Sequence, residues 1–595
     1  MPEPVPTIAS SHIGQLAAHL NALYPPAQAQ QALARLVPRL EAFARTFPGL
    51  QLPAGDSRVD EHDIILITYG DQVQESGKPP LQSLDELLAA RVGGILTGVH
   101  ILPFYPSTSD DGFSVVDYLE VDPALGDWSD IERLAAHFRL MVDAVINHIS
   151  ASSAWFRGFL VGDPRFRDYF ITVDPTTDLS TVTRPRALAL LTPVEAAHGV
   201  EHVWTTFSTD QIDLNYANPE VLLAMTDVLL HYVAHGAQFI RLDAIAYLWK
   251  EVGTACIHLA RTHRVVQFWR TVLNAVAPRT LLITETNVPH LENISYFGDG
   301  TNEAQLVYQF PLPPLTLHAF RTGDARHLQA WAADLTTPSN QTTFFNFLAS
   351  HDGIGVRPAE GILSLAEVQG LVDLAQAHGG YVSYKTNPDG SRSPYELNIN
   401  YFDALNDPAA DEPQSTQIDR FMAAQAILLS LAGVPGIYVH SLFASRSWRE
   451  GVAQTDRYRT INRQKFQRAA LERELAETRS LRHQVFSRYR ALIKARIRQP
   501  AFHPQGGQQI VAVNPALFSF VRTAPDNSSR VLCIHNVSAT AQSFAADLSM
   551  AGIRSDAGLT DLISGRTYSV NAGQTGTLTV PPYGVLWLRS EQGNK

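Results

Sequence analysis

The sequence predicts an α/β protein built on a (β/α)8 TIM barrel, with an inserted small domain, a lid excursion and a C-terminal all-β domain. Three observations lead to this prediction. Eight short runs rich in Ile, Val and Leu alternate with helical stretches, as expected of parallel strands buried on both faces. Two of the intervals between these runs are longer than a crossover helix needs. After about residue 500 the helical period gives way to short alternating segments.

The first segment, 1–60, is expected to be a helical N-terminal extension, because apolar residues recur at helical spacing on both sides of Pro25-Pro26. The barrel strands are then expected in the eight apolar runs. These runs are 64–70, 98–106, 140–148, 237–245, 280–288, 304–310, 343–352 and 433–441. Eight β/α repeats favour a closed barrel over an open sheet.

The uneven spacing of the runs divides the rest of the chain. A long gap after the third run predicts an inserted small domain, and another after the seventh predicts a lid whose stretch 379–408 is rich in Gly, Asn, Asp, Pro and Tyr. The expected parts are barrel segments 61–148, 218–352 and 416–500, the inserted domain 149–217, the lid 353–415 and the C-terminal β domain 501–595.

Composition excludes several classes of function. A formal charge of −12 without a long basic run argues against a nucleic-acid partner. No stretch approaches the roughly 18 apolar residues of a membrane span, and the first thirty residues lack a secretory signal, so we expect a cytoplasmic protein with no membrane partner. Cys256 and Cys533 are too few for a disulfide framework or a cysteine metal site. We expect a monomer or a homodimer.

Polar residues close four of the apolar runs, and the carboxyl ends of barrel strands are where active sites form. A single acidic residue there is more often a helix cap. Carboxylates and two histidines that recur at four such ends indicate a catalytic site instead. The residues are Asp143, Asn147 and His148 after the third run, Arg241 and Asp243 after the fourth, Glu285 after the fifth, and His351 and Asp352 after the seventh.

Four ordered segments containing these residues resemble the signature regions of the α-amylase superfamily, glycoside hydrolase family thirteen. They are DAVINH (143–148), FIRLDA (239–244), LLITETN (281–287) and ASHDGIG (349–355). Within the superfamily the chain looks like the sucrose phosphorylase subfamily. The segments with counterparts there are 109–128, 241–254, 351–358 and 459–463, and the resemblance covers roughly 60–590.

The resemblance implies a retaining mechanism with Asp243 as nucleophile, Glu285 as acid/base and Asp352 as transition-state stabiliser. Such chemistry requires one carboxylate to attack the anomeric carbon and one carboxylic acid to protonate the leaving oxygen, with their carboxyl groups about 5 to 5.5 Å apart. Glu285 must therefore have a raised pKa. Arg241 lies two residues before Asp243 and so points the same way along the strand, where its cation can keep Asp243 ionised.

The same resemblance implies a pocket for one glucosyl unit. His148 and His351 match paired histidines that bind glucose hydroxyls, although a single histidine at a strand end is usually structural. The far end of the glucose is expected to meet Asp110 and Arg459, and an aromatic platform with a polar neighbour is expected from Phe113, Phe207 and Gln211.

The acceptor side departs from the sucrose enzymes. Asn287 stands where sucrose phosphorylases usually carry His, and Tyr395-Glu396 stands where they usually carry Tyr-Gln, which puts sucrose in doubt. The segment Arg184-Pro185-Arg186 has Pro where sucrose 6-phosphate phosphorylases place an Arg, yet Arg184 and Arg186 together are expected to supply an anion site.

The N-terminal extension, the TETN segment and the lid look more like glucosylglycerate phosphorylases, whose acceptor is a small hydroxy acid. Lys385 and Arg392 in the lid are candidates to pair with its carboxylate, and an equally weighted alternative is that both are solvated loop charges.

We therefore expect a glycoside phosphorylase that transfers an α-glucosyl unit between a small glucoside and phosphate, with glucosylglycerate as the favoured glucoside. The alternatives are a sucrose or sucrose 6-phosphate phosphorylase, and an α-glucoside hydrolase or transglucosylase with the same three carboxylates. A non-catalytic sugar-binding protein is disfavoured because all three carboxylates are present. We expect no cofactor apart from inorganic phosphate as co-substrate, and no metal, because no Asp/Asn-rich loop has calcium-ligand spacing.

Overall fold

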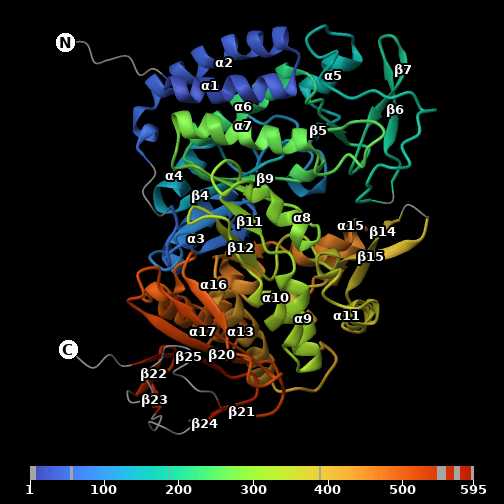
Figure 1. Cartoon of the computed structure of the whole chain (residues 1–595). Helices are drawn as coiled ribbons and strands as arrows, with labels where there is room; N and C mark the ends of the chain where they lie inside the picture. The colour runs from blue at the N-terminus through green and yellow to red at the C-terminus, as the bar shows by residue number, and fades with distance from the viewer. Residues whose placement is uncertain are drawn as a thin grey trace, which may run out of the picture.

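The computed structural model describes residues 8–53, 58–186, 188–387, 390–545, 558–568 and 577–590. Its centre is a closed barrel with the spatial order β1-β16-β12-β11-β10-β9-β4-β3, seen in Figure 1. The strands are β1 (Ile65–Thr68), β3 (Gly98–Ile101), β4 (Arg139–Ala144), β9 (Ala237–Leu242), β10 (Leu281–Thr284), β11 (Leu306–Tyr308), β12 (Thr343–Phe347) and β16 (Val434–Tyr438). Each predicted apolar run contains one of these parallel strands, so the barrel prediction is confirmed.

The strands are shorter than the apolar runs that predicted them, and this difference positions the site. The fourth run was predicted to continue to residue 245, but β9 ends at Leu242; the fifth was predicted to continue to 288, but β10 ends at Thr284. The last residues of both runs therefore lie in loops at the carboxyl end of the barrel, where side chains can face a ligand.

Helices surround the barrel. They include α3 (Pro80–Val92), α4 (Trp128–His137), α6 (Pro219–Ala234), α7 (Ala260–Val276), α8 (His290–Ile294), α9 (Leu312–Thr322), α10 (Arg326–Ala333), α13 (Gln414–Ser430), α14 (Val439–Leu442), α15 (Arg449–Thr455), α16 (Arg468–Ala476) and α17 (Leu481–Arg496). A short parallel pair joins β2 (Val73–Gln74) to β17 (Phe466–Gln467). None of the described helices combines the length and apolar character that crossing a membrane requires.

The N-terminal extension consists of α1 (Ser10–Leu23) and α2 (Pro26–Thr46), separated where the sequence carries two prolines. Figure 1 shows both helices lying over α6 and α7 at one end of the molecule, and they contact those helices. Leu16 and Leu20 are fully buried there and belong to the same hydrophobic core as the barrel. The extension is thus packed on the barrel.

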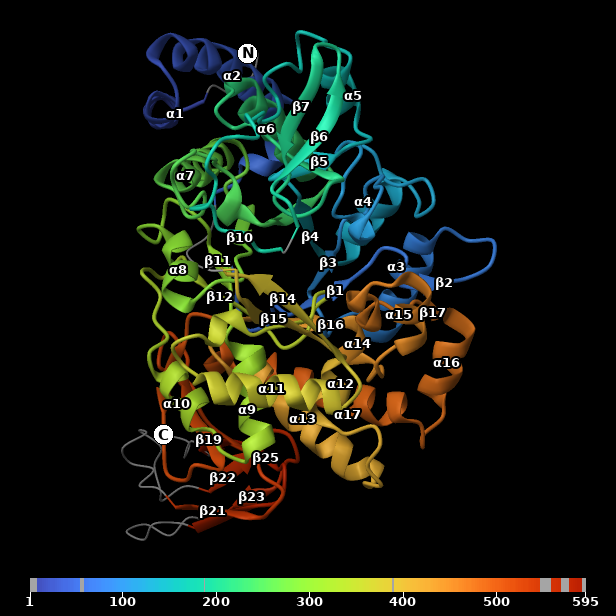
Figure 2. The same cartoon turned by 90° about the vertical axis from the view of Figure 1, so that its right-hand side faces the viewer.

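The inserted segment leaves β4 and returns before α6. It contains α5 (Ala154–Leu160), the hairpin β6 (Leu191–Ala196) and β7 (Gly199–Trp204), and the antiparallel pair β5 (His148–Ser150) and β8 (Gln211–Asp213). The lid contains β13 (Ile354–Gly355), α11 (Leu365–Ala377), β14 (Tyr381–Thr386), β15 (Arg392–Asn398) and α12 (Tyr401–Leu405). Figure 2 shows the lid hairpin β14–β15 across the carboxyl end of the barrel from the inserted hairpin.

The C-terminal region is all-β in its described part from β18 onward, as predicted. One sheet has the order β18-β19-β20-β25-β22-β23, and β21 pairs with β24. Their bounds are β18 (Gly507–Ile510), β19 (Leu517–Thr523), β20 (Arg530–Asn536), β21 (Gln542–Ala545), β22 (Leu559–Asp561), β23 (Thr567–Tyr568), β24 (Thr577–Val580) and β25 (Val585–Ser590). Parts of the predicted segments fall outside the described residues, namely 1–7, 54–57, 187, 388–389, 546–557, 569–576 and 591–595.

Candidate active site

A cavity with many polar side chains in its lining lies at the carboxyl ends of the barrel strands, between the inserted domain and the lid. Every residue predicted for the site lines it except Arg184, Lys385 and Arg392. These residues are Asp110, Phe113, His148, Arg186, Phe207, Gln211, Arg241, Asp243, Glu285, Asn287, His351, Asp352, Tyr395, Glu396 and Arg459. The lining also includes Tyr247, Thr286, Val288 and Phe310, which sequence reasoning missed.

Asp243 and Glu285 are the first residues after β9 and β10. Because Leu242 pairs with Thr284 in the parallel register, the two carboxylates come side by side. Arg241 Nη1 donates a hydrogen bond to Asp243 Oδ1 over 2.9 Å, whereas its Nη2 lies 3.8 Å from Glu285 Oε2. The guanidinium therefore favours the charge on Asp243 more than the charge on Glu285.

Burial raises the pKa of both carboxyls. For Asp243, Arg241 opposes this effect while the charges of Glu285 and Asp352 add to it. For Glu285, burial and Asp352 raise the pKa and Arg241 lowers it. The shorter contact of Arg241 with Asp243 favours the charge on Asp243 and, when the pair holds one proton, favours that proton on Glu285. The arrangement thus favours one ionised and one protonated carboxyl group in the pair.

Arg241 is itself held by a buried chain of polar contacts from neighbouring strands. Asp143 on β4 contacts Arg241 Nη1, and Asp143 Oδ2 lies 2.7 Å from His100 Nε2 on β3. Burial acts to raise the pKa of Asp143, but Arg241 and His100 outweigh it and hold the pKa below its usual range. The sequence places Asp143 at a strand end but indicates no role for it, and it gives no signal for His100, because GVHI is typical of an ordinary buried strand.

Asp352 is surrounded by arginines. Arg459 Nη1 lies 2.5 Å from Asp352 Oδ1, and Arg463 Nη2 lies 3.8 Å from the same atom. Burial acts to raise the pKa of Asp352, but these two cations, Arg459 first, hold it below the usual value. This favours the ionised form of Asp352.

Arg459 and Asp110, both expected to meet the far end of the glucose, line the same cavity, and Arg459 is bound to Glu396. Its Nε and Nη2 donate to the two oxygens of Glu396 over 3.0 and 2.6 Å, and the backbone N–H of Gly353 donates to Glu396 Oε1. Asp110 lies 4.0 Å from Arg463, whose Nη1 contacts the neighbouring Asp111. Glu396 is thus bound within the site rather than free on the acceptor side.

Histidines and aromatic residues line another part of the cavity. Phe113 and His351 stack with ring centroids 4.8 Å apart, and His148 lies with its ring 5.3 Å from that of Phe207. Gln211 Nε2 lies 3.2 Å from His148 Nε2. Burial lowers the pKa of His148, and burial together with Arg463 lowers that of His351, so both imidazoles are neutral and can exchange hydrogen bonds with hydroxyls.

The acceptor side of the cavity contains Arg186, Tyr247, Asn287 and Tyr395. Within the described ranges Arg186 has no ion-pair partner. The Oδ1 atom of Asn287 is buried and lacks a hydrogen-bond partner in the same part of the chain. A cation and an open acceptor atom therefore lie near Glu285, where a second substrate would bind.

The structure separates Lys385 and Arg392 from this cavity. In the hairpin β14–β15, Lys385 pairs with Ser393 and Thr386 with Arg392, close to the turn and away from the barrel. The Lys385 ammonium lies 3.3 Å from Glu360, and Arg392 is exposed. Neither can reach the catalytic cavity in this arrangement.

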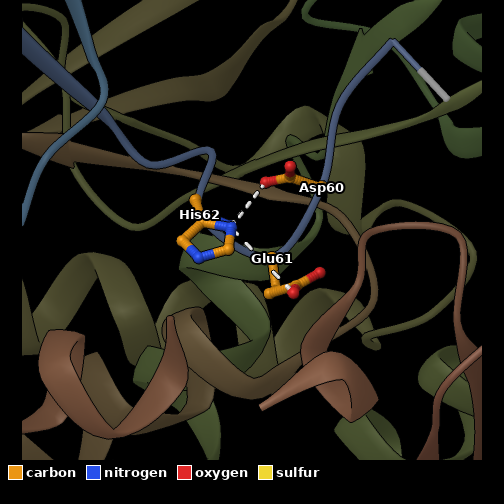
Figure 3. Close-up of side chains that lie close together, drawn as sticks. All are labelled: Asp60, Glu61 and His62. Carbon is orange, nitrogen blue, oxygen red and sulfur yellow. Dashed lines mark hydrogen bonds and ion pairs between the residues drawn. The ribbon is translucent and has the colours of Figure 1, made fainter. Parts of the chain in front are cut away.

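A group with potential metal ligands lies elsewhere. Asp60, Glu61 and His62 have ligand atoms within 4.8 Å of one another, and His62 Nδ1 lies 3.1 Å from Asp60 (Figure 3). They precede β1, at the amino end of the barrel, opposite the catalytic cavity. This group therefore has no part in the site described above.

The fold and site agree with comparisons to known proteins. Residues 94–356 match the α-amylase catalytic domain, and residues 508–587 match the maltogenic amylase C-terminal domain. The glucosylglycerate phosphorylase of Allomeiothermus silvanus is 57% identical over 80% of this chain and 84% of that protein. That of Escherichia coli is 47% identical over 86% and 90%. The crystal structure of sucrose 6F-phosphate phosphorylase from Thermoanaerobacter thermosaccharolyticum gives a TM-score of 0.69 at 26% identity, covering 80% of this chain and 94% of that one.

The barrel, its three carboxylates and these matches together define a glycoside phosphorylase of the α-amylase superfamily. Within that superfamily the chain belongs to the family of the glucosylglycerate phosphorylases. The resemblance found in the four signature segments is thereby confirmed.

Proposed function

We propose that this enzyme is a retaining glucosylglycerate phosphorylase, which transfers the α-glucosyl unit of glucosylglycerate to inorganic phosphate and releases glycerate and α-glucose 1-phosphate. The observation that carries the proposal is the pair Asp243 and Glu285 on adjacent strands, with Arg241 bound to Asp243 and only near Glu285. The names of relatives at 47% to 57% identity support the substrate.

In the proposed first step an oxygen of ionised Asp243 bonds to the anomeric carbon while the bond from that carbon to the glycerate oxygen breaks. Glu285 gives its proton to the departing oxygen. In the second step a phosphate oxygen bonds to the anomeric carbon, the bond to Asp243 breaks, and Glu285 takes up the phosphate proton. Two inversions at one carbon restore the α configuration.

Asp352 is proposed to bind glucose hydroxyls and to stabilise the positive charge that develops on the sugar ring. The support is its ionised form, which Arg459 favours. The neutral His148 and His351 are proposed to bind further hydroxyls, with Phe113 and Phe207 beside them. We propose that this part of the cavity binds a single glucosyl unit.

Arg186 and Asn287 are proposed to bind the acceptor. Phosphate and glycerate are both anions, so a cation without an ion-pair partner in the described structure suits either one. Asn287 Oδ1, which is buried and unpartnered there, can accept a hydrogen bond from a glycerate hydroxyl.

The test is to supply α-glucose 1-phosphate with glycerate, fructose, fructose 6-phosphate or glycerol and to measure the phosphate released. Glycerate should be used best. Arg186→Gln should raise the KM for glycerate by about ten- to a hundredfold, the equivalent of about 1.5 to 3 kcal/mol for a charged hydrogen bond. Arg165→Gln, at an exposed ion pair with Asp163 in the same inserted domain, is the matched control and should not change the KM.

Equal use of glycerol and glycerate would contradict recognition of the carboxylate. Rapid release of glucose from glucosides without phosphate would favour a hydrolase, which uses the same carboxylates.

We also propose that phosphate is the co-substrate without a further cofactor and that the protein is a monomer or homodimer. We propose a cytoplasmic location, which the free thiols of Cys256 and Cys533 support.

A further inference from the structure

A second cavity lies between the inserted domain and the lid, beside the catalytic one. It is formed by residues 179–185 and Leu190 of the inserted domain, by Lys385, Thr386, Asn387 and Gly390 of the lid hairpin, and by Arg357 and Tyr395. Tyr395 also lines the catalytic cavity. The second cavity therefore adjoins the side of the active site that lies toward Glu285.

Three cations face this second cavity, namely Arg184, Arg357 and Lys385. Two glutamates lie near them: Glu360, 3.3 Å from Lys385, and Glu292, 3.8 Å from Arg357. Both glutamates are close to half exposed, so water screens their charge. The cavity thus carries an excess of positive charge.

Two of these cations also carry buried donors without acceptors. Arg184 donates through Nη2 to the backbone oxygen of Leu188, but its Nε is buried without a hydrogen-bond partner in the described ranges. Arg357 Nε is likewise buried and unpartnered there. Because buried N–H groups are nearly always hydrogen-bonded in folded proteins, this arrangement calls for a ligand with several acceptor oxygens.

We propose that the anion vestibule, defined by Arg184, Arg357 and Lys385, is a second binding site for an oxyanion, either phosphate or a small carboxylate. It is distinct from the acceptor position beside Arg186 in the catalytic cavity. The inference rests on the proposed function and deepens it, since both substrates and both products of that reaction are anions. A cationic site beside the entrance raises the local concentration of the incoming anion. The vestibule also includes Lys385, which cannot reach the catalytic cavity.

The test uses the Asp243→Asn variant, in which no turnover consumes the ligands. The protein is saturated with α-glucose 1-phosphate, so that the catalytic cavity is filled, and inorganic phosphate is then titrated in and followed by calorimetry. We expect one remaining phosphate site. Adding Arg184→Gln and Arg357→Gln together should weaken it at least tenfold, whereas the control Arg165→Gln should leave it unchanged.

Parallel titrations with glycerate and with glycerol show which class of oxyanion the site binds. Glycerate binding to the same site would show that it accepts carboxylates, and glycerol should not bind because it has no charge. Affinity for α-glucose 1-phosphate, measured first for each variant, reports whether the fold is intact. If the double variant does not fold, the single variants Arg184→Gln and Arg357→Gln decide the question.

The proposal is overturned if neither phosphate nor glycerate binds to the saturated protein. It is also overturned if binding persists unchanged in variants that retain affinity for α-glucose 1-phosphate. Because the measurement involves no glucosyl transfer, it is independent of which acceptor the enzyme uses. A failure of the proposed function, seen as no phosphate release with glycerate, therefore remains distinguishable from a failure of the vestibule.

Discussion

Lys250 connects the inserted domain to the barrel through a buried ion pair. Its side chain is 3% exposed, and Nζ lies 2.5 Å from Asp213 Oδ2 on β8 and 2.7 Å from Asn147 Oδ1 after β4. Lys250 itself follows β9, so three segments meet at one ammonium group. Asn147 immediately precedes His148, which lines the catalytic cavity.

Replacing Lys250 with Met keeps most of the side-chain volume but removes the charge. Asp213 would then retain Thr206, through N–H at 2.8 Å and Oγ1 at 2.6 Å, and Asn147 Nδ2 at 3.1 Å. These neutral donors do not compensate a buried charge. Removing one partner of a buried ion pair costs about 3 to 5 kcal/mol, so the free energy of unfolding should fall by that amount.

Urea unfolding followed by tryptophan fluorescence measures this loss, since Trp204 and Trp249 are buried in this region. Lys78→Met is the control, because Lys78 pairs with Glu86 at the surface and should cost about 0 to 1 kcal/mol. Adding Asp213→Asn to Lys250→Met should recover much of the lost stability by removing the unpaired charge. A loss no larger than that of Lys78→Met would refute the reasoning.

Two further predictions concern the carboxylates. Asp243→Asn should abolish glucosyl transfer while leaving the fold intact, since a retaining mechanism has no path without its covalent intermediate; near-wild-type turnover would contradict the assignment. Burial raises the pKa of Glu285, and the protonated form is the acid, so wild-type phosphorolysis should decline as the pH rises through that pKa. Glu285→Gln should lack this decline and should lose less activity with α-glucosyl fluoride than with glucosylglycerate, because fluoride leaves without protonation; equal losses with both donors would argue against its role as acid.

The sequence was sufficient to predict the barrel and the meeting of Asp243 with Glu285. Both strands are short apolar runs, and parallel strands end at the same edge, so polar residues that close adjacent runs must converge. The chain of polar contacts behind Arg241 was not predictable in the same way. His100 lies inside a buried strand, and its pairing with Asp143 depends on the alignment of β3 with β4 across the barrel.

The composition of the lid segment predicts that a lid exists but not how its strands pair. Its Gly, Asn, Asp and Pro content predicted a lid but not the register of β14 with β15, which shifts between Ser383 and Tyr384. That register places Tyr395 and Glu396 in the catalytic cavity and leaves Lys385 outside it. Charge-bearing lid residues could therefore be named from sequence, but not assigned to one cavity or the other.

The contacts of Glu396 explain how a carboxylate can lie in a cavity that is proposed to bind anionic acceptors. A carboxylate on the acceptor side would repel phosphate and glycerate, yet Glu396 is buried and both of its oxygens accept hydrogen bonds from Arg459. Arg459 also pairs with Asp352, so one cation is shared by two carboxylates and has no unpaired charge to offer an incoming anion. We infer that Glu396 acts with Arg459 on the glucose side and that selection of an anionic acceptor falls to Arg186, whose charge stays available.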